Sequence, residues 1–508
     1  MEARVRYAPS PTGLQHIGSL RTALFNYLYA RSVDGKFLVR LEDTDQTRCA
    51  PEYVQNLYDT FAWLGIQWNE GPDIGGPVGP YIQSQRLEKY REQALALLEK
   101  DLAYPCFCSS ERLEAIRAER EASKSSESGY DRHCRAIPKE EAARRVAAGE
   151  SHVIRLKIPL GESTRFCDQL LGDIEWKNDD VSPDPVLLKT DGFPTYHLAN
   201  VVDDHLMGIT HVLRAQEWVS STPLHVIMYK AFGWEAPVFC HLPMVMGQDG
   251  KKLSKRHGST SIDDFRTQGY LPEALVNYVA LLGCSYEEGR DLYSLDELAS
   301  LFRLEKLNKA PAVFDYKRLE WYNGQYIRMK TDSELASLVE PYAIRDGLFG
   351  AAGTEPSAGQ KNLFQAAIPL VKERLSFLHE ASDKLRYLFA EPPLPAAEEY
   401  FPKKKGAAES LELLSLSLPL VKTLSIAEDP DAEAAVKALA EQSGKKLGDL
   451  LMPLRVAITG ARVSPPLFGS MRLLGEETCV KRIEAALELL RRAAAAAPAS
   501  GPSNGAVQ

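Results

Sequence analysis

Residues 9–18 read Pro-Ser-Pro-Thr-Gly-Leu-Gln-His-Ile-Gly, and they connect a strand-like stretch to a helical one. Before them, residues 3–8 have the pattern of a short β-strand, and the two prolines enforce an extended loop after it. After them, apolar side chains recur at helical spacing, and residues 37–41 form a second strand-like run. A strand, a loop, a helix and a strand in this order are typical of the start of a parallel α/β sheet.

Length and composition bound the class of protein. A chain of 508 residues predicts about three domains, and 44% hydrophobic with 25% charged residues excludes disordered, collagen-like and fibrous proteins. The sequence has no run of 18 apolar residues and no signal-peptide stretch, so we expect a cytoplasmic protein without a membrane partner. The net charge of −9 argues against a general polyanion binder but allows local basic patches for nucleic acid.

The loop at residues 9–18 lies at the carboxyl end of the predicted sheet, where open α/β sheets bind ligands. We expect the amides at the start of the following helix to bind phosphate, because they lack partners there and the helix dipole is positive. Gly18 lets a nucleotide approach the backbone, and His16 can donate to a phosphate oxygen as charge develops. Taken alone, a histidine and a glycine at a helix start are more typical of capping or packing.

A second motif lies at residues 249–256, which read Asp-Gly-Lys-Lys-Leu-Ser-Lys-Arg. Several cations in a loop beside a glycine suit a leaving pyrophosphate, because they neutralise charge as the bond between the α- and β-phosphates breaks. Taken alone, this loop is more typical of a solvated basic surface.

Together the two motifs resemble the HIGH and KMSKS signatures of class I aminoacyl-tRNA synthetases. Further runs narrow the resemblance to the glutamyl-tRNA synthetases of the bacterial type, and it covers residues 3–492. These runs are residues 6–13, 21–26, 42–45, 194–205, 252–256, 446–448 and 453–460.

The resemblance implies a Rossmann-like α/β catalytic domain with an inserted acceptor-binding domain, followed by mainly α-helical stem-contact and anticodon-binding domains. The expected boundaries are 1–82 and 196–261 for the two catalytic halves, 83–195 for the insertion, 262–325 for the stem-contact domain, 326–492 for the anticodon-binding domain, and 493–508 for a disordered tail. Within the insertion, residues 83–105 are expected to be helical. The locally basic residues 302–330 are expected to contact tRNA phosphates.

The activity that the resemblance implies is that of a glutamate–tRNA ligase. Such an enzyme activates L-glutamate with ATP and Mg²⁺ to glutamyl-adenylate, and members of this family usually need tRNA for that step. It then transfers the glutamyl group to the 2′-hydroxyl of the terminal adenosine of tRNA(Glu). The resemblance leaves open whether tRNA(Gln) is charged as well, and it implies a monomer.

The resemblance also implies a set of site residues. The ATP-binding residues are His16, Gly18, Lys252 and Lys255, of which His16, Lys252 and Lys255 are expected to be catalytic. The glutamate pocket consists of Arg6, Ser10, Glu42, Tyr196, Asn200, Arg214 and Trp218. Arg6 and Tyr196 are expected to bind the side-chain carboxylate, Arg214 the α-carboxylate and Glu42 the ammonium group; a structural pairing of Arg6 with Glu42 or Asp43 is the alternative. Arg374 is expected to read the anticodon, with a plain surface arginine as its alternative.

A cysteine group lies in the predicted insertion. Cys106, Cys108 and Cys134, with Tyr130, resemble a version of the zinc site that some members of the family and close relatives have there. Three thiolates and a fourth ligand fit a structural tetrahedral zinc site. His133 is the alternative fourth ligand, and three reduced thiols without metal are the alternative to the site itself.

Three other functions share part of these features. A relative that glutamylates a modified tRNA base lacks the helical anticodon-binding half. A nucleotidylyltransferase shares the histidine signature and the sheet, but has neither the glutamate-binding set nor the C-terminal domains. A non-catalytic tRNA-binding module is expected to lose His16 or Lys255, and this chain has both.

Overall fold

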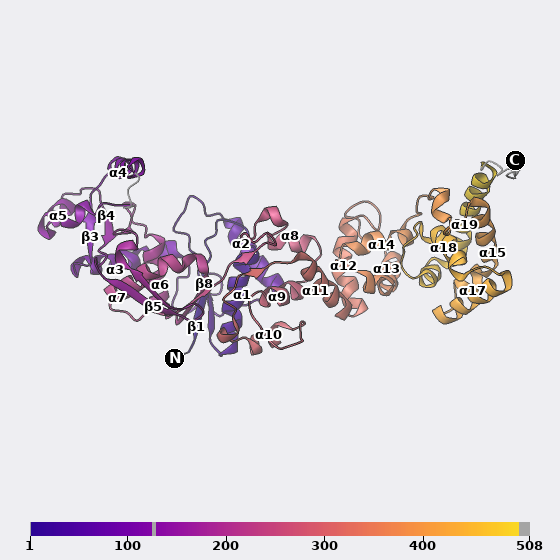
Figure 1. Cartoon of the computed structure of the whole chain (residues 1–508), viewed down its shortest axis with the longest axis horizontal. Helices are drawn as coiled ribbons and strands as arrows, with labels where there is room; N and C mark the ends of the chain where they lie inside the picture. The colour runs from indigo at the N-terminus through magenta and orange to yellow at the C-terminus, as the bar shows by residue number, and fades with distance from the viewer. Residues whose placement is uncertain (1, 124–128, 497–508) are drawn as a thin grey trace, which may run out of the picture. The chain divides into compact units, whose positions relative to one another are not determined.

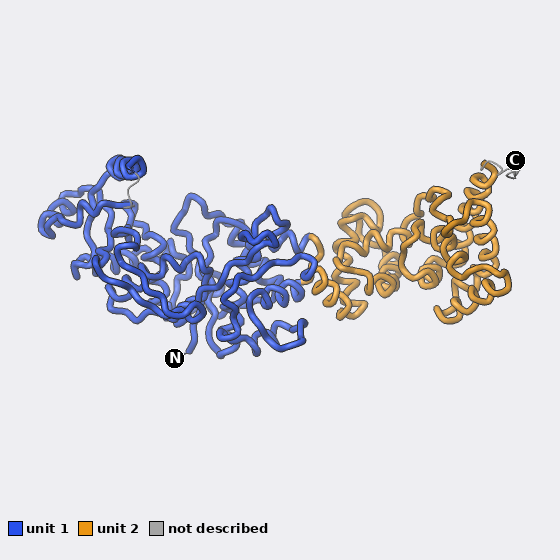
Figure 2. The backbone as a smooth tube through the Cα atoms, viewed as in Figure 1, with its two compact units in different colours: residues 1–267, 272–319 blue, residues 268–271, 320–508 orange. Residues whose placement is uncertain are grey.

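The computed structural model describes residues 2–123 and 129–496 and divides into two compact units (Figure 2). Unit 1 comprises Met1–Thr267 and Pro272–Leu319, and unit 2 comprises Gln268–Leu271 and Glu320–Gln508. The predicted boundaries inside these units stay predictions.

Unit 1 begins with the predicted α/β pattern (Figure 1). Strands β1 (Arg4–Tyr7) and β2 (Lys36–Val39) pair in parallel, and α1 (Ile17–Ser32) connects them. Strands β8 (His211–Ala215) and β9 (Val238–Leu242) also pair in parallel, with α7 (Thr222–Phe232) between them. The backbone N–H of Arg4, at the start of β1, donates to the hydroxyl of Thr210, just before β8. Strands β1 and β8 therefore start side by side, and the carboxyl ends of both parallel pairs lie at the same edge. The predicted α/β catalytic fold is confirmed.

The remaining elements of the α/β part complete unit 1. They are α2 (Pro51–Leu64), α6 (Tyr196–Leu206), β10 (Val245–Met246), α8 (Ile262–Thr267), α9 (Pro272–Ala280), α10 (Leu295–Leu301) and β11 (Ala312–Val313). Leu198, Val202, Val212 and Ile227 belong to the buried core that α6, α7 and the sheet share.

The inserted region contains its own small sheet, in which β4 (Val153–Leu156) pairs with β3 (Ala103–Cys106) and β7 (Val186–Leu188). Its other elements are α3 (Leu87–Glu99), α4 (Ser110–Ala122), α5 (Lys139–Ala147) and the hairpin of β5 (Ser163–Asp168) and β6 (Gly172–Lys177). The expected helix over 83–105 is wrong at its end, because Asp101 has a left-handed backbone (φ 59°) and Pro105 lies in strand β3.

Unit 2 is helical, as predicted for the C-terminal half. After α11 (Tyr316–Met329), its helices are α12 (Asp332–Arg345), α13 (Ala358–Val371), α14 (Glu380–Phe389), α15 (Ala407–Ser417), α16 (Val421–Leu424), α17 (Asp429–Ser443), α18 (Leu447–Thr459) and α19 (Leu467–Ala496). Apolar residues of α15, α18 and α19, such as Leu413, Leu454 and Ile483, form a common core.

The end of α19 bears on the predicted tail. The helix continues to Ala496, so residues 493–496 are helical where the sequence suggests disorder. The rest of that tail, residues 497–508, lies outside the described residues. Among the helices that the structure describes, none combines the length and the apolar composition needed to cross a membrane.

Candidate active site

His16 is the N-cap of α1. Its Nδ1 accepts hydrogen bonds from the backbone N–H groups of Gly18 (3.1 Å) and Ser19 (3.2 Å), and Ser19 Oγ accepts from the His16 backbone N–H (2.9 Å). Because Nδ1 is an acceptor, the proton of the neutral ring is on Nε2. Burial, and then the charge of Lys252, lower the pKa of His16, so the ring is neutral near pH 7 and Nε2–H can donate to a ligand.

The expectation that the first amides of α1 bind phosphate is wrong. Ile17 N–H donates to the carbonyl of Thr260 (3.0 Å), and the amides of Gly18 and Ser19 donate to His16. These donors are therefore satisfied by the protein. Gly18 has a different role: a Cβ atom at this position would lie 3.2 and 3.3 Å from Cε1 and Nδ1 of His16, so glycine makes room for the ring.

A cavity of about 860 Å³ opens beside His16. It is lined by every residue that the sequence suggests for ATP and glutamate: Arg6, Ser10, His16, Gly18, Glu42, Tyr196, Asn200, Arg214, Trp218, Lys252 and Lys255. These residues lie far apart in the sequence, and the folding of β1, α6, β8 and the basic loop brings them to one place.

A buried network of charges reaches the cavity at Arg6 and Glu42. Arg6 binds Asp204 with two nitrogens, at 3.0 and 3.2 Å, and Arg40 binds Asp204 (2.7 Å) and Glu42 (3.0 Å). The partner of Arg6 is thus neither Glu42 nor Asp43. Burial raises the pKa of Asp204, but Arg6 and Arg40 lower it more, and the net shift is downward. Burial raises the pKa of Glu42 despite the opposing effect of Arg40.

Sequence reasoning missed Arg40 and Asp204. Both are buried, with Arg40 fully inaccessible. The available signal was a charged side chain directly after the apolar strand β2, since an arginine buried in such a setting requires a carboxylate partner.

Two aromatic rings and the guanidinium of Arg214 also line the cavity. Tyr196, at the start of α6, and Trp218 have ring centroids 4.4 Å apart. Burial, and then the charge of Glu42, raise the pKa of Tyr196 to about 12, so its hydroxyl stays protonated and can donate. Arg214, in β8, is 5% exposed, and burial lowers its pKa.

The basic loop contributes the exposed side of the cavity. Lys252 Nζ lies 2.8 Å from Glu217 Oε2, and Lys255 begins the short 3₁₀ helix Lys255–His257. His257 Nε2 lies 2.9 Å from Asp249 Oδ1 and helps to fold the loop back on itself. The lysine ammonium groups can thus bind a polyphosphate, and Lys252 has an internal carboxylate partner that such a ligand would replace.

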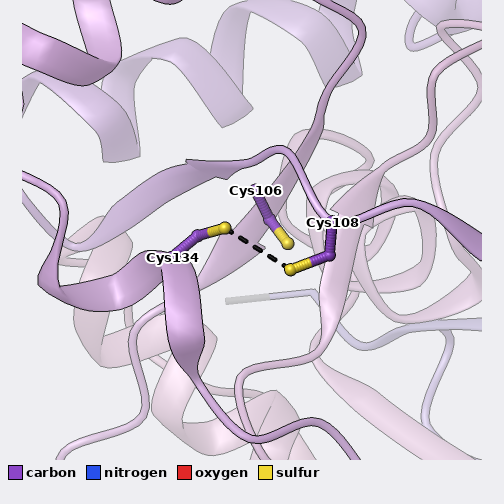
Figure 3. A group of neighbouring side chains, drawn as sticks. All are labelled: Cys106, Cys108 and Cys134. Atoms are coloured by element: carbon purple, nitrogen blue, oxygen red, sulfur yellow. Dashed lines mark hydrogen bonds between the residues drawn. The ribbon is translucent and has the colours of Figure 1, made fainter. Parts of the chain in front are cut away.

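The cysteine group lies in the inserted region (Figure 3). The Sγ atoms of Cys106, Cys108 and Cys134 lie within 4.8 Å of one another, and Cys108 and Cys134 are 3.5 Å apart. The Tyr130 hydroxyl lies 3.4 Å from Cys106 Sγ and 3.8 Å from Cys108 Sγ, whereas His133 is exposed and outside the group.

Arg374 lies in unit 2, in the 3₁₀ helix Lys372–Arg374, and its side chain is exposed. Its Nη1 donates to the carbonyl of Ser464, whose hydroxyl accepts from Arg455 at 2.8 Å. Burial, and then the neighbouring Arg374, lower the pKa of Arg455. The two guanidinium groups therefore form a local positive site that suits an anionic or base-edge ligand.

Comparison with known proteins gives matches along almost the whole chain. A family model described as tRNA synthetases class I (E and Q), catalytic domain, matches residues 2–321, and a model described as anticodon binding domain matches residues 334–487.

Individual relatives agree with these family matches. A glutamate–tRNA ligase from Treponema denticola is 56% identical over 503 residues, which cover 96% of this chain and 99% of the relative. The ligase from Borreliella burgdorferi is 49% identical over 492 residues, with coverages of 97% and 99%. A crystal structure of a glutamate tRNA ligase from Elizabethkingia meningosepticum, in complex with its amino acid, superimposes with a TM-score of 0.86 at 34% identity and covers 96% of this chain and 100% of that one.

Proposed function

The chain belongs to the class I glutamate–tRNA ligases, and we propose that its 860 Å³ cavity binds ATP between His16 and the basic loop and glutamate between Arg6 and Trp218. Enzymes of this family use ATP with Mg²⁺ to join glutamate to tRNA(Glu). The match over residues 334–487 separates the chain from the base-glutamylating relative, which lacks that half. The observation that carries the proposal is that all the residues expected for both substrates line one cavity.

In the first step, an α-carboxylate oxygen of glutamate attacks the α-phosphorus of ATP. An O–P bond forms, the bond to the β-phosphate oxygen breaks, and pyrophosphate leaves. His16 donates from Nε2 to a phosphate oxygen, while Lys252 and Lys255 neutralise the leaving group. Lys252 exchanges Glu217 for pyrophosphate, which costs little because an exposed ion pair is worth about 1 kcal/mol or less.

In the second step, the 2′-hydroxyl of the terminal adenosine attacks the glutamyl carbonyl. An ester bond forms, the bond between the carbonyl carbon and the phosphate oxygen breaks, and AMP leaves with that electron pair, while the hydroxyl proton passes to the departing phosphate. Because the glutamate carboxylate is already ionised and the mixed anhydride is an activated electrophile, positioning and electrostatic stabilisation account for most of the catalysis.

The glutamate pocket matches the charges of its ligand. Arg6 and Tyr196 bind the side-chain carboxylate, Arg214 binds the α-carboxylate, and Glu42 binds the ammonium group. Ser10, Asn200 and Trp218 complete the pocket. Glutamine lacks the side-chain charge and would leave an arginine without its partner, so an editing site is not needed to reject it.

We further propose that Cys106, Cys108, Cys134 and Tyr130 hold one structural zinc ion. Tetrahedral coordination with Zn–S bonds of about 2.3 Å requires sulfurs about 3.8 Å apart. The sulfurs of Cys108 and Cys134 are 3.5 Å apart, and all three sulfurs lie within 4.8 Å of one another. Such a site keeps a net negative charge, which Arg112 beside Cys108 (3.3 Å) and Arg155 over the Tyr130 ring (4.0 Å) would offset. The metal would fix the fold of the insertion.

The tRNA choice is tested by attaching glutamate to purified tRNA(Glu) and tRNA(Gln) with ATP and Mg²⁺. We propose that Arg374 reads the anticodon, so attachment to tRNA(Glu) alone would support a discriminating enzyme and an Arg374→Gln variant would then be less selective. Attachment to both would indicate a non-discriminating enzyme, and attachment to neither would refute the proposed function. We also propose that the chain works as a monomer in the cytoplasm, where translation takes place.

A further inference from the structure

The guanidinium of Arg214 differs in its partners from those of Arg6 and Arg40. Arg6 and Arg40 each bind carboxylates directly. Arg214 instead donates to four uncharged acceptors: His241 Nε2 (3.0 Å), His225 Nδ1 (3.2 Å), Thr222 Oγ1 (2.8 Å) and the Trp218 carbonyl (3.5 Å). Its positive charge is therefore not cancelled by a directly bound acid.

These contacts determine the tautomers of both histidines. An arginine can only donate, so His241 Nε2 and His225 Nδ1 must carry lone pairs, and the ring protons lie on the opposite nitrogens. Those nitrogens have suitable acceptors: Asp168 Oδ2 lies 2.6 Å from His241 Nδ1, and His197 Nδ1 lies 3.0 Å from His225 Nε2. Burial, followed by the charge of Arg214, lowers the pKa of His197 to about 4.

Asp168, at the end of the hydrogen-bonded series Arg214–His241–Asp168, is held in place by backbone amides. Asp168, the last residue of β5, accepts the amides of Leu170 (3.0 Å) and Leu171 (2.8 Å) with Oδ1 and the amide of His241 (3.1 Å) with Oδ2. Asp168 and His241 are fully buried, as is His225 to within 1%. None of these three side chains lines the cavity, whereas Arg214 does.

We propose that His241 and His225 are positioning residues that accept N–H groups of Arg214 and leave its charge for a carboxylate of glutamate, and that Asp168 acts through His241 by fixing its ring. This inference rests on the proposed glutamate-binding role of Arg214. With neutral acceptors, no directly bound acid shares the positive charge of Arg214, whereas Arg6 shares its charge with Asp204.

The test uses two pairs of amide variants in the full chain. The amide of asparagine reaches about as far as Nδ1 of histidine, and that of glutamine reaches about as far as Nε2. At position 241 the acceptor for Arg214 is Nε2, so His241→Gln keeps it and His241→Asn loses it. At position 225 the acceptor is Nδ1, so His225→Asn keeps it and His225→Gln loses it.

The assay is ATP–pyrophosphate exchange in the presence of tRNA, with the KM for glutamate and the KM for ATP measured separately. The two acceptor-losing variants are expected to raise the glutamate KM about tenfold or more, because a buried donor loses its partner, while the two acceptor-keeping variants stay within about threefold of the parent. The KM for ATP is expected to stay within about twofold in all four variants.

A merely structural role would make the two substitutions at each position equally harmful, or would change both KM values together, and either result would overturn the proposal. The reversed preference for Asn and Gln between the two positions keeps the test valid if one variant does not fold. Arg214→Gln is measured beside them. If Arg214→Gln leaves the glutamate KM unchanged, the proposed role of Arg214 itself is wrong. If Arg214→Gln raises the glutamate KM but the acceptor-losing and acceptor-keeping histidine variants do not differ, only the positioning role is rejected.

Discussion

Replacement of Gly18 by alanine is expected to lower the rate of glutamate activation while the unfolding free energy stays nearly unchanged. Gly18 is the second residue of α1, where alanine would normally gain about 0.5–1 kcal/mol in helix stability. Here the added Cβ would lie 3.2 Å from His16 Cε1 and 3.3 Å from Nδ1, and the ring must move by a few tenths of an ångström. The N-cap that this ring provides is worth about 1 kcal/mol, so its distortion offsets the gain.

The expected result of Gly18→Ala is a nearly unchanged unfolding free energy with a fall in kcat for glutamate activation. A misplacement of 1 Å can cost about a hundredfold in rate, so a smaller shift of Nε2 should cost about tenfold. Activation is measured by ATP–pyrophosphate exchange with tRNA present, and stability by urea unfolding followed by circular dichroism.

Gly359→Ala is the matched control. Gly359 is also the second residue of its helix, α13, and a Cβ there meets nothing within 4 Å. This variant should gain about 0.5–1 kcal/mol without any loss of activity. A Gly18→Ala enzyme whose kcat stays within about twofold of the parent would refute the idea that glycine is needed to make room for the His16 ring.

Three further predictions follow from buried groups. Asp204→Asn should lower the unfolding free energy by about 3–5 kcal/mol and raise the glutamate KM, because Arg6 and Arg40 lose their shared carboxylate. His197 has a pKa of about 4 in the folded chain and about 6.5 when unfolded. Its contribution to stability is therefore complete above pH 6.5 and is lost as the pH falls toward 4. His197→Gln should make the thermal unfolding midpoint depend less on pH across this range. Purified enzyme should contain one zinc per chain by elemental analysis, and Tyr130→Phe should lose it more readily to a chelator.

Two of these predictions have a control at an exposed residue. Glu175→Gln breaks the exposed ion pair with Arg165 and should change stability by about 1 kcal/mol or less. His133→Gln should leave the zinc content unchanged, since its side chain is exposed and outside the cysteine group. Equal losses of unfolding free energy in Asp204→Asn and Glu175→Gln would contradict the role of the buried carboxylate. An unchanged pH dependence of the unfolding midpoint in His197→Gln would contradict the role of that histidine. Loss of zinc in His133→Gln but not in Tyr130→Phe would contradict the proposed ligand set.

The sequence was sufficient to predict those features that local patterns encode. Strand β1, helix α1 and the cavity-lining residues follow from periodicity and from motifs whose order resembles a known family. Features that depend on tertiary pairing were not accessible. Asp204 is the partner of Arg6, but the two are separated by 198 positions and nothing in either motif links them.

The prediction for the amides of α1 failed for a related reason. A helix start in sequence looks like a set of unpaired donors, yet the partner of Ile17 is a carbonyl at Thr260, and the partner of the next two amides is the ring of His16 itself. Strand β3 was hidden in the same way, because its pairing with β4 outweighs the helical spacing of the preceding residues.

The double use of the His16 ring has a consequence for the behaviour of the enzyme in acid. Because Nδ1 accepts two amides of α1, a proton cannot be added there unless both hydrogen bonds break. Formation of the imidazolium and fraying of the first turn of α1 are therefore one event. Folding of α1 thus places the proton of the neutral ring on Nε2, and acid is expected to loosen the first turn of the helix that holds the ring in place.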